Sequence, residues 1–210
     1  MFSLESILMK LLLLPVILLA LTVHEFAHGY VAYLRGDSTA KDMGRLTLNP
    51  IPHIDILGLV FLIFFSFGWA KPVPINPSNF KTPRKDEIMV ALAGVTANLI
   101  CALAFGMLLR FVNFNAFGQQ AGIIQTFVYW AVFINCGLAV FNLIPIPPLD
   151  GSHVLRELLP YNAAVKYVIF FSNPIVSWVL LGVFFLFPGF ITPVIIGPIT
   201  FLVRIFAGGV

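Results

Sequence analysis

The sequence contains little charge. Only 10% of its 210 residues are Asp, Glu, Lys or Arg, whereas 60% are hydrophobic. Soluble domains carry about 25% charged residues, so this composition argues against an ordinary soluble protein and favours one surrounded largely by a lipid bilayer. The net charge is +3, and the basic residues lie in short loops. That pattern suits membrane orientation, and no nucleic-acid partner is expected.

Cysteines and polar linkers are also scarce. The two cysteines, Cys101 and Cys136, each lie inside an apolar segment, where neither a zinc-ligand spacing nor a disulfide is expected. No polar linker divides the chain. We therefore expect one transmembrane domain over residues 1–210, with its core motifs within 11–155 and C-terminal helices at about 161–207.

Long uncharged runs indicate the membrane segments. Glu25 is the one formally charged residue between Lys10 and Arg35, so this run fits a transmembrane helix. Further apolar runs predict helices at about 88–110 and 121–143, and two more in 167–203 on either side of Pro188-Gly189. The fold class predicted is an all-α polytopic membrane protein with about five full transmembrane helices.

The first apolar run carries the motif LTVHEFAHGY. Its histidines, His24 and His28, are four residues apart and share one face of a helix. Two imidazoles so placed can bind one zinc ion, and Glu25 lies about 100° around the helix, close enough to take a proton from water at the metal. An ionisable residue in a membrane helix costs about 2.5–3.5 kcal/mol on insertion scales. These three groups therefore need a compensating partner, and a metal ion is the obvious one.

A catalytic zinc ion usually has three protein ligands, so one more is required. Asp150 stands out because it follows the prolines of NLIPIPPLDG, which free the backbone from helical geometry. Non-helical backbone is tolerated at membrane depth where it lines a cavity. On spacing alone, a plain turn at the membrane surface is an equal alternative. The other candidates are His53, Asp55, Asp86, Glu87, His153 and Glu157.

Together these motifs resemble the site-2 protease family of intramembrane zinc metalloproteases. That family pairs HExxH in a hydrophobic helix with an N-x-x-P-x-P-x-L-D-G type motif, which is matched here at 142–151. Its G-x-x-x-N pattern is matched by Gly94 and Asn98. The resemblance covers about 11–155 and is closest to the short prokaryotic form without a PDZ or CBS module.

The resemblance implies a role for each motif residue. Glu25 would act as the general base and then as the proton donor to the leaving amine. Asn98 and Asn142 would steady the substrate carbonyl or the oxyanion, although helix–helix hydrogen bonding is the alternative for both. His53 and His153 are expected near the membrane boundaries and away from the metal. The ligands of one zinc ion per chain would be His24, His28 and Asp150.

The placement of basic residues predicts a re-entrant or extended element at about 51–77. If 51–69 crossed the bilayer completely, Asp150 would emerge on the wrong face to meet the histidines. If 51–77 enters and returns, nine basic residues fall on one side, and two further C-terminal spans bring Arg204 to that side, which gives ten of the twelve. The positive-inside rule makes that side cytosolic, so the active site of this multi-pass protein is expected toward the cytosolic side of a prokaryotic cell membrane. The WAKPVPINP stretch within the element is either an edge for strand pairing with substrate or an ordinary loop.

The function predicted is that of an intramembrane zinc endopeptidase, which hydrolyses peptide bonds within or near transmembrane segments of a protein substrate. One alternative is a membrane metal transporter or metal-sensing protein that uses the same three ligands. Glu25 has no required role in that alternative. Another is an inactive protease-like protein that binds membrane partners, and the intact Glu25 argues against it.

Overall fold

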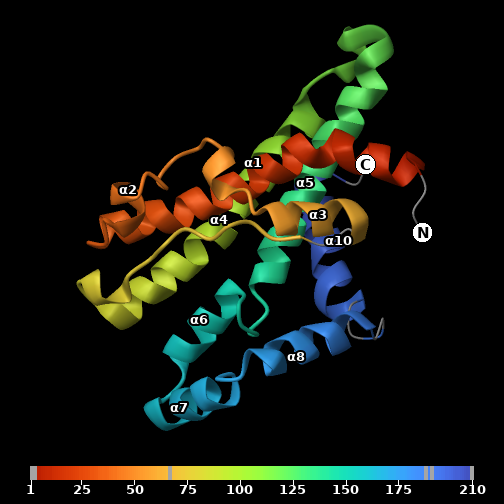
Figure 1. The fold of residues 1–210 in the computed structure, drawn as a ribbon. Helices are drawn as coiled ribbons and strands as arrows, with labels where there is room; N and C mark the ends of the chain where they lie inside the picture. The colour runs from red at the N-terminus through yellow and green to blue at the C-terminus, as the bar shows by residue number, and fades with distance from the viewer. Residues whose placement is uncertain (1–3, 66–67, 187–188, 190–191, 209–210) are drawn as a thin grey trace.

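The computed structural model describes residues 4–65, 68–186, 189 and 192–208. Within these residues the regular structure is helical, apart from one isolated antiparallel β-bridge between Ile54 and Ala70 (Figure 1). Apolar runs fold into helices in a membrane because a helix satisfies every backbone hydrogen bond within one segment. The prediction of an all-α membrane protein is confirmed.

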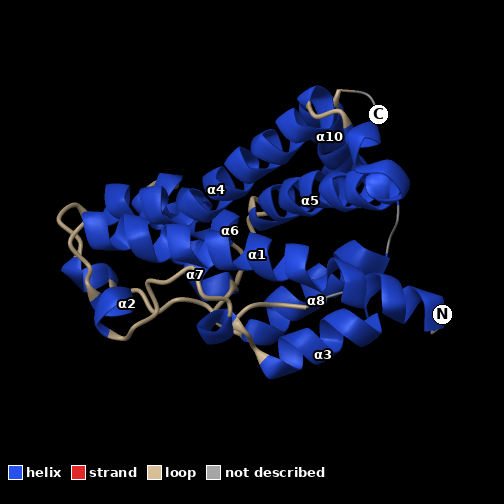
Figure 2. Ribbon diagram, turned by 90° about the horizontal axis from the view of Figure 1, so that it is seen from above, coloured by secondary structure: helices blue, strands red, loops and turns tan. Residues whose placement is uncertain are grey.

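Three long helices form the centre of the molecule. They are α1 (Leu4–Leu34), α4 (Pro83–Phe111) and α5 (Ala121–Asn142). All three are long and apolar enough to cross a membrane, and α4 packs against both α1 and α5 (Figure 2). Small buried side chains such as Ala102 on α4 and Ala131 on α5 let the helices approach closely. The chain is therefore a multi-pass membrane protein.

The C-terminal part contains an additional break that was not predicted, while the predicted division at Pro188 lies outside the described residues. Helices α7 (Tyr161–Phe170) and α8 (Pro174–Leu186) meet at an angle of 83°, so the uncharged run is already broken before Pro174. Pro174 disfavours helical geometry at Asn173, whose side chain instead accepts a hydrogen bond from the backbone of Ile175 at 3.0 Å. Among the described residues, three helices are long and apolar enough to cross a membrane, or four spans result if this bent pair counts as one. The number of five stays a prediction.

The described residues of the segment 51–77 fold back on themselves. It contains the 3₁₀ turn η1 (Ile51–His53) and helix α3 (Ile56–Phe65), which at ten residues is too short to cross a bilayer. An extended stretch follows, in which the backbone N–H of Lys71 donates to the carbonyl of His53 at 2.9 Å. The chain thus returns beside its starting point, as the re-entrant prediction requires.

Shorter elements connect these parts. A proline-rich bend links the end of α5 to α6 (Asp150–Leu158), which packs against α4. The remaining elements are α2 (Thr39–Asp42), η2 (Pro77–Asn79), η3 (Phe114–Gln120), η4 (Thr192–Ile196) and α10 (Gly197–Ala207).

Candidate metal centre and active site

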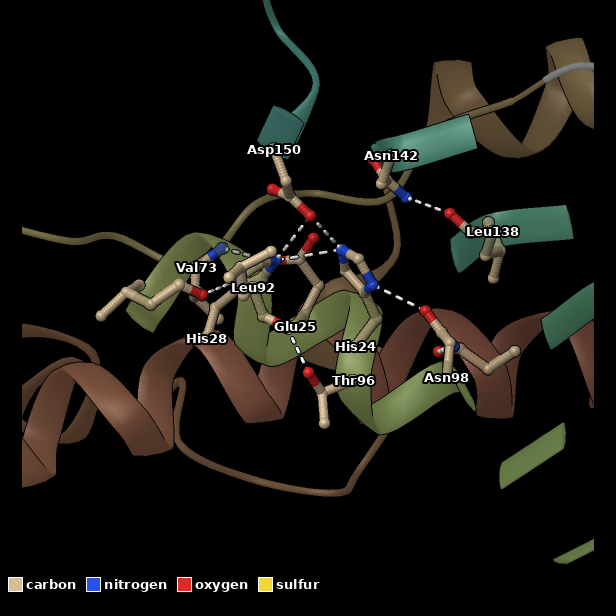
Figure 3. Close-up of polar contacts among 12 residues, drawn as sticks. His24, Glu25, His28, Val73, Leu92, Thr96, Asn98, Leu138, Asn142 and Asp150 are labelled. Atoms are coloured by element: carbon tan, nitrogen blue, oxygen red, sulfur yellow. Dashed lines mark hydrogen bonds and ion pairs between the residues drawn. The ribbon is translucent and has the colours of Figure 1, made fainter. Parts of the chain in front are cut away.

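Three side chains from distant parts of the chain converge on one point (Figure 3). On α1, the Nε2 atoms of His24 and His28 lie 3.0 Å apart. Asp150, the first residue of α6, places its Oδ2 atom 3.2 Å from Nε2 of His24 and 3.3 Å from Nε2 of His28. Both histidines are buried.

The opposite sides of the two imidazole rings face helix α4. Nδ1 of His28 lies 2.7 Å from the carbonyl oxygen of Val90, and Nδ1 of His24 lies 2.7 Å from Oδ1 of Asn98. Both partners are acceptors, so each Nδ1 carries the hydrogen atom and each Nε2 keeps a lone pair. The two lone pairs and the carboxylate of Asp150 therefore point at one another.

This arrangement fits a divalent metal ion. Three acceptor atoms that face one another without a hydrogen between them repel unless a cation lies among them, and Oδ2 of Asp150 is buried without a hydrogen-bond donor. Two nitrogen ligands of a tetrahedral zinc ion lie about 3.3 Å apart. The observed separations of 3.0, 3.2 and 3.3 Å match that geometry.

Glu25 lies beside the metal centre and contacts the extended part of the re-entrant element. Its Oε2 atom accepts a hydrogen bond from the backbone N–H of Val73 at 2.8 Å. Glu25 and the three converging side chains line a cavity of about 710 Å³. Trp178 and Leu181 of α8 also line it, so the metal centre opens into a space with largely apolar walls.

Comparison with known proteins identifies the family. The sequence model of Peptidase family M50 matches residues 112–180. A Bacillus subtilis protein named "Putative zinc metalloprotease YwhC" is 39% identical over 181 residues, which are 78% of this chain and 81% of that protein. The chain belongs to the M50 (site-2 protease) family.

Further relatives of this M50 protein are more distant. "Putative zinc metalloprotease Rip2" of Mycolicibacterium smegmatis is 34% identical over 148 residues, which are 68% of this chain and 55% of that protein. "Zinc metalloprotease MJ0392" of Methanocaldococcus jannaschii is 24% identical over 140 residues, which are 67% of this chain and 32% of that protein. No solved structure matches the chain. The chain is a membrane zinc metalloprotease.

The contacts of Asn98 in this M50 protease are those of the helix–helix alternative. Its amide is fully buried, and its Oδ1 faces His24. Its Nδ2 donates to the carbonyl of Ala20 at 3.1 Å and to Oδ1 of Asn135 at 2.9 Å. Both ends of the amide are thus engaged by protein groups, and Asn98 is not among the residues that line the cavity. Its expected contact with the substrate stays a prediction.

Asn142 lies at the wall of the active-site cavity, as expected for a residue near the substrate. It is the last residue of α5, and its Nδ2 donates to the carbonyl of Leu138 one turn earlier at 3.0 Å. Its part in catalysis stays a prediction.

The spare histidines lie outside the metal centre. His53 is buried with Nε2 2.9 Å from the carbonyl oxygen of Thr47. His153 lines the cavity, and its Nδ1 lies 3.6 Å from Oε1 of Glu87. Glu87 also forms an ion pair with Arg156. Glu87 belongs to α4, whereas His153 and Arg156 belong to α6. These contacts therefore hold α6 against α4 close to Asp150, the first residue of α6.

The proline-rich bend of the M50 motif places Asp150 at the metal centre. After α5 ends, two tight turns reverse the chain, with the N–H of Ile146 bonded to the carbonyl of Ile144 and the N–H of Leu149 bonded to that of Ile146. Gly151 follows this bend, and a Cβ atom added to Gly151 would lie 2.8 Å from the carbonyl oxygen of Ile144. Only glycine lets α6 begin this close to the end of α5.

Sequence reasoning missed Asn135, Val73 and Val90. Val73 and Val90 act through their backbone atoms, and the type of side chain at a position does not predict such a contact. Asn135 did carry a signal, because it is an amide inside an apolar helix, where a polar group needs a partner.

We predict that Gly94→Ala weakens zinc binding. A Cβ atom on Gly94 would lie 2.5 Å from Cε1 of His24 and 2.6 Å from Nε2 of His28, so the methyl group must push the imidazoles or α4 aside. Disturbed support of a ligand typically costs 10- to 100-fold in metal affinity, so we expect a loss of about tenfold or more. Competition with a chelator measures it. Gly137→Ala is the control, because its Cβ atom meets only Ile199, at 3.8 Å. Equal affinity of both variants would contradict the packing argument.

Proposed function

We propose that the chain is an intramembrane zinc endopeptidase that hydrolyses peptide bonds within or beside transmembrane segments. The observation that supports this most directly is the position of the metal centre. His24 and His28 lie within a helix long and apolar enough to cross a membrane, and they face a cavity with largely apolar walls. A water-shielded peptide bond can be hydrolysed there only if water is activated at the same depth.

In this proposal His24, His28 and Asp150 hold the zinc ion. When bound, zinc acts as a Lewis acid that polarises a carbonyl group and lowers the pKa of water to about 7. Glu25 takes the proton from the attacking water and delivers it to the leaving amine. The hydrogen bond from Val73 fixes Oε2 of Glu25, so Oε1, which no described residue engages, is left for the proton.

An apolar groove offers a path to the site. It measures about 550 Å³ and lies between α1, α3 and α5. Leu21, Leu138 and Phe141 line both this groove and the active-site cavity, so the two spaces adjoin. A transmembrane segment of the substrate would leave lipid through the groove and reach the zinc ion without crossing a polar surface.

The extended stretch Trp69–Pro77 would pair with the unwound substrate as an added strand. Lys71 and Val73 each precede a proline and are therefore restricted to extended geometry. N–H groups two residues apart in an extended strand point the same way, so Ile75 presents its N–H on the side where Val73 faces Glu25. Pro72 and Pro74 remove donors only from the opposite edge. The prolines are therefore compatible with pairing on the active-site side.

A role in metal transport receives less support. Within the described ranges the structure contains one group of side chains able to hold a metal ion, and a transit pathway requires successive sites. Glu25, held against the re-entrant element, would have no task in transport.

Glu25→Gln should retain zinc and lower the turnover number by about 10²- to 10⁴-fold, because the amide has the same shape but cannot accept the proton. The assay is cleavage of a transmembrane reporter by purified protein in liposomes, with and without a zinc chelator, alongside metal analysis. Asp42→Asn makes the same chemical change at an exposed site and should leave cleavage unchanged. Substantial cleavage by the glutamine variant would remove Glu25 from the mechanism.

Asp150→Ala should lose zinc and activity, whereas His153→Ala should keep one zinc per chain. The reason is that Oδ2 of Asp150 faces both Nε2 atoms, while His153 pairs with Glu87. Zinc per protein is measured after dialysis against a weak chelator. The opposite result, with zinc lost only from the His153 variant, would show that the third ligand is misassigned.

If the active site faces the cytosol, as we propose, two exposed loops should be labelled from opposite sides. Single cysteines at Ser78 and Asn115, in a background with Cys101 and Cys136 replaced by alanine, should react with an impermeant reagent from the cytosolic and the external side respectively. Both positions are exposed, so reactivity reports sidedness rather than burial. Labelling of both from one side would overturn the topology.

A further inference from the structure

Asn135 is a buried amide in the middle of an apolar helix. Its side chain is 1% exposed, and it lies on α5, away from the cavity that holds the metal centre. Its Oδ1 accepts from Nδ2 of Asn98 at 2.9 Å, and its Nδ2 donates to the carbonyl of Ala131 at 2.8 Å. Asn98 in turn contacts Nδ1 of His24 at 2.7 Å. A single chain of hydrogen bonds therefore runs from α5 through α4 to a residue of the metal centre.

The direction of the Asn98 amide decides which nitrogen of His24 carries the hydrogen atom. With Oδ1 toward the imidazole, Nδ1 must be the donor, and Nε2 keeps the lone pair that faces the metal centre. If the amide turned over, its NH₂ group would donate to Nδ1, and the hydrogen atom of the neutral ring would move to Nε2. A protonated Nε2 cannot bind a metal ion.

Two acceptors hold the amide of Asn98 in the productive direction. One is the carbonyl of Ala20, at 3.1 Å from Nδ2. That oxygen belongs to α1, where the regular helical pattern already gives it the backbone N–H of His24 as a donor. The other is Oδ1 of Asn135, whose own direction is set by the bond of its Nδ2 to Ala131. Asn135 is therefore the acceptor dedicated to Asn98.

We propose that Asn135 is a positioning residue for the zinc centre: it fixes the direction of the Asn98 amide and thereby keeps the lone pair of His24 on Nε2. The inference rests on the proposed role of His24 as a zinc ligand. A simple adhesive contact between α4 and α5 would stabilise the fold in the same way with or without metal. A positioning role instead couples Asn135 to metal affinity.

The test compares Asn135→Leu with Asn135→Asp. Leucine has a similar size but no acceptor for Asn98. The aspartate variant keeps an oxygen at the position of Oδ1 of Asn135, so it still offers Asn98 an acceptor. By chelator competition we expect zinc affinity to fall about 10- to 100-fold in the leucine variant and to stay close to wild type in the aspartate variant. Nitrogen-15 NMR of histidine-labelled metal-free protein should show the hydrogen of His24 on Nδ1 in the wild type and on Nε2 in a substantial fraction of the leucine variant.

Val132→Ala serves as the control for lost packing, since Val132 is fully buried one turn earlier on α5. It should lower the melting temperature without changing zinc affinity. The proposal is overturned if Val132→Ala and Asn135→Leu weaken zinc binding equally, or if the leucine variant binds zinc like the wild type. Asn135→Ala repeats the comparison should the leucine variant not fold. His24→Ala tests the ligand role of His24 separately from the positioning role of Asn135. Zinc binding that survives this change refutes the ligand role, and the positioning role with it.

Discussion

The position of two hydrogen atoms, one on each imidazole of the metal centre, is the constraint on which the rest of the structure depends. Both must lie on Nδ1, and α4 provides the two acceptors that keep them there, with a glycine one turn from each. Val90 offers a carbonyl to His28, Asn98 offers an amide oxygen to His24, and Gly94 between them leaves room for both rings. One face of α4 is thus complementary to the face of α1 that carries the histidines.

The demand for partners explains how polar groups persist in an apolar bundle. An amide buried in lipid without a partner costs free energy, so each polar group at this depth brings in another element. Asn98 is satisfied by α1 and by Asn135 of α5. Asp150 reaches the histidines because prolines and Gly151 reverse the chain at the end of α5. The three long helices and α6 are therefore joined through the metal centre as well as through apolar packing.

Much of this architecture could be predicted from the sequence because its signals are local. The spacing of His24 and His28, the prolines before Asp150 and the uncharged runs each lie within a short stretch. The supporting contacts are not local: Val90 and Val73 act through backbone atoms, and Asn98 had two chemically reasonable roles until its partners were known. The break before Pro174 was not predicted, because the uncharged run around it is long enough for a membrane helix and Asn173-Pro174 is the single local sign of a break.

The re-entrant element shows how a segment with few hydrogen bonds can still be held in register. Arg45 donates to the carbonyls of Lys71 and Pro72 at 2.8 and 3.2 Å, at the start of the extended stretch. At its end, Asp37 accepts from the backbone of Asn76 at 2.7 Å.

Burial raises the pKa of Asp37, but hydrogen bonds from Thr39, Asn76 and Asn79 outweigh it and hold the pKa below its usual value, so this anchor stays charged. Between the two anchors the N–H of Val73 meets Glu25. Glu25, the proposed general base, is therefore positioned by the same strand that is proposed to hold the substrate. Pairing of the substrate with this strand would then also set the distance from the scissile bond to Glu25.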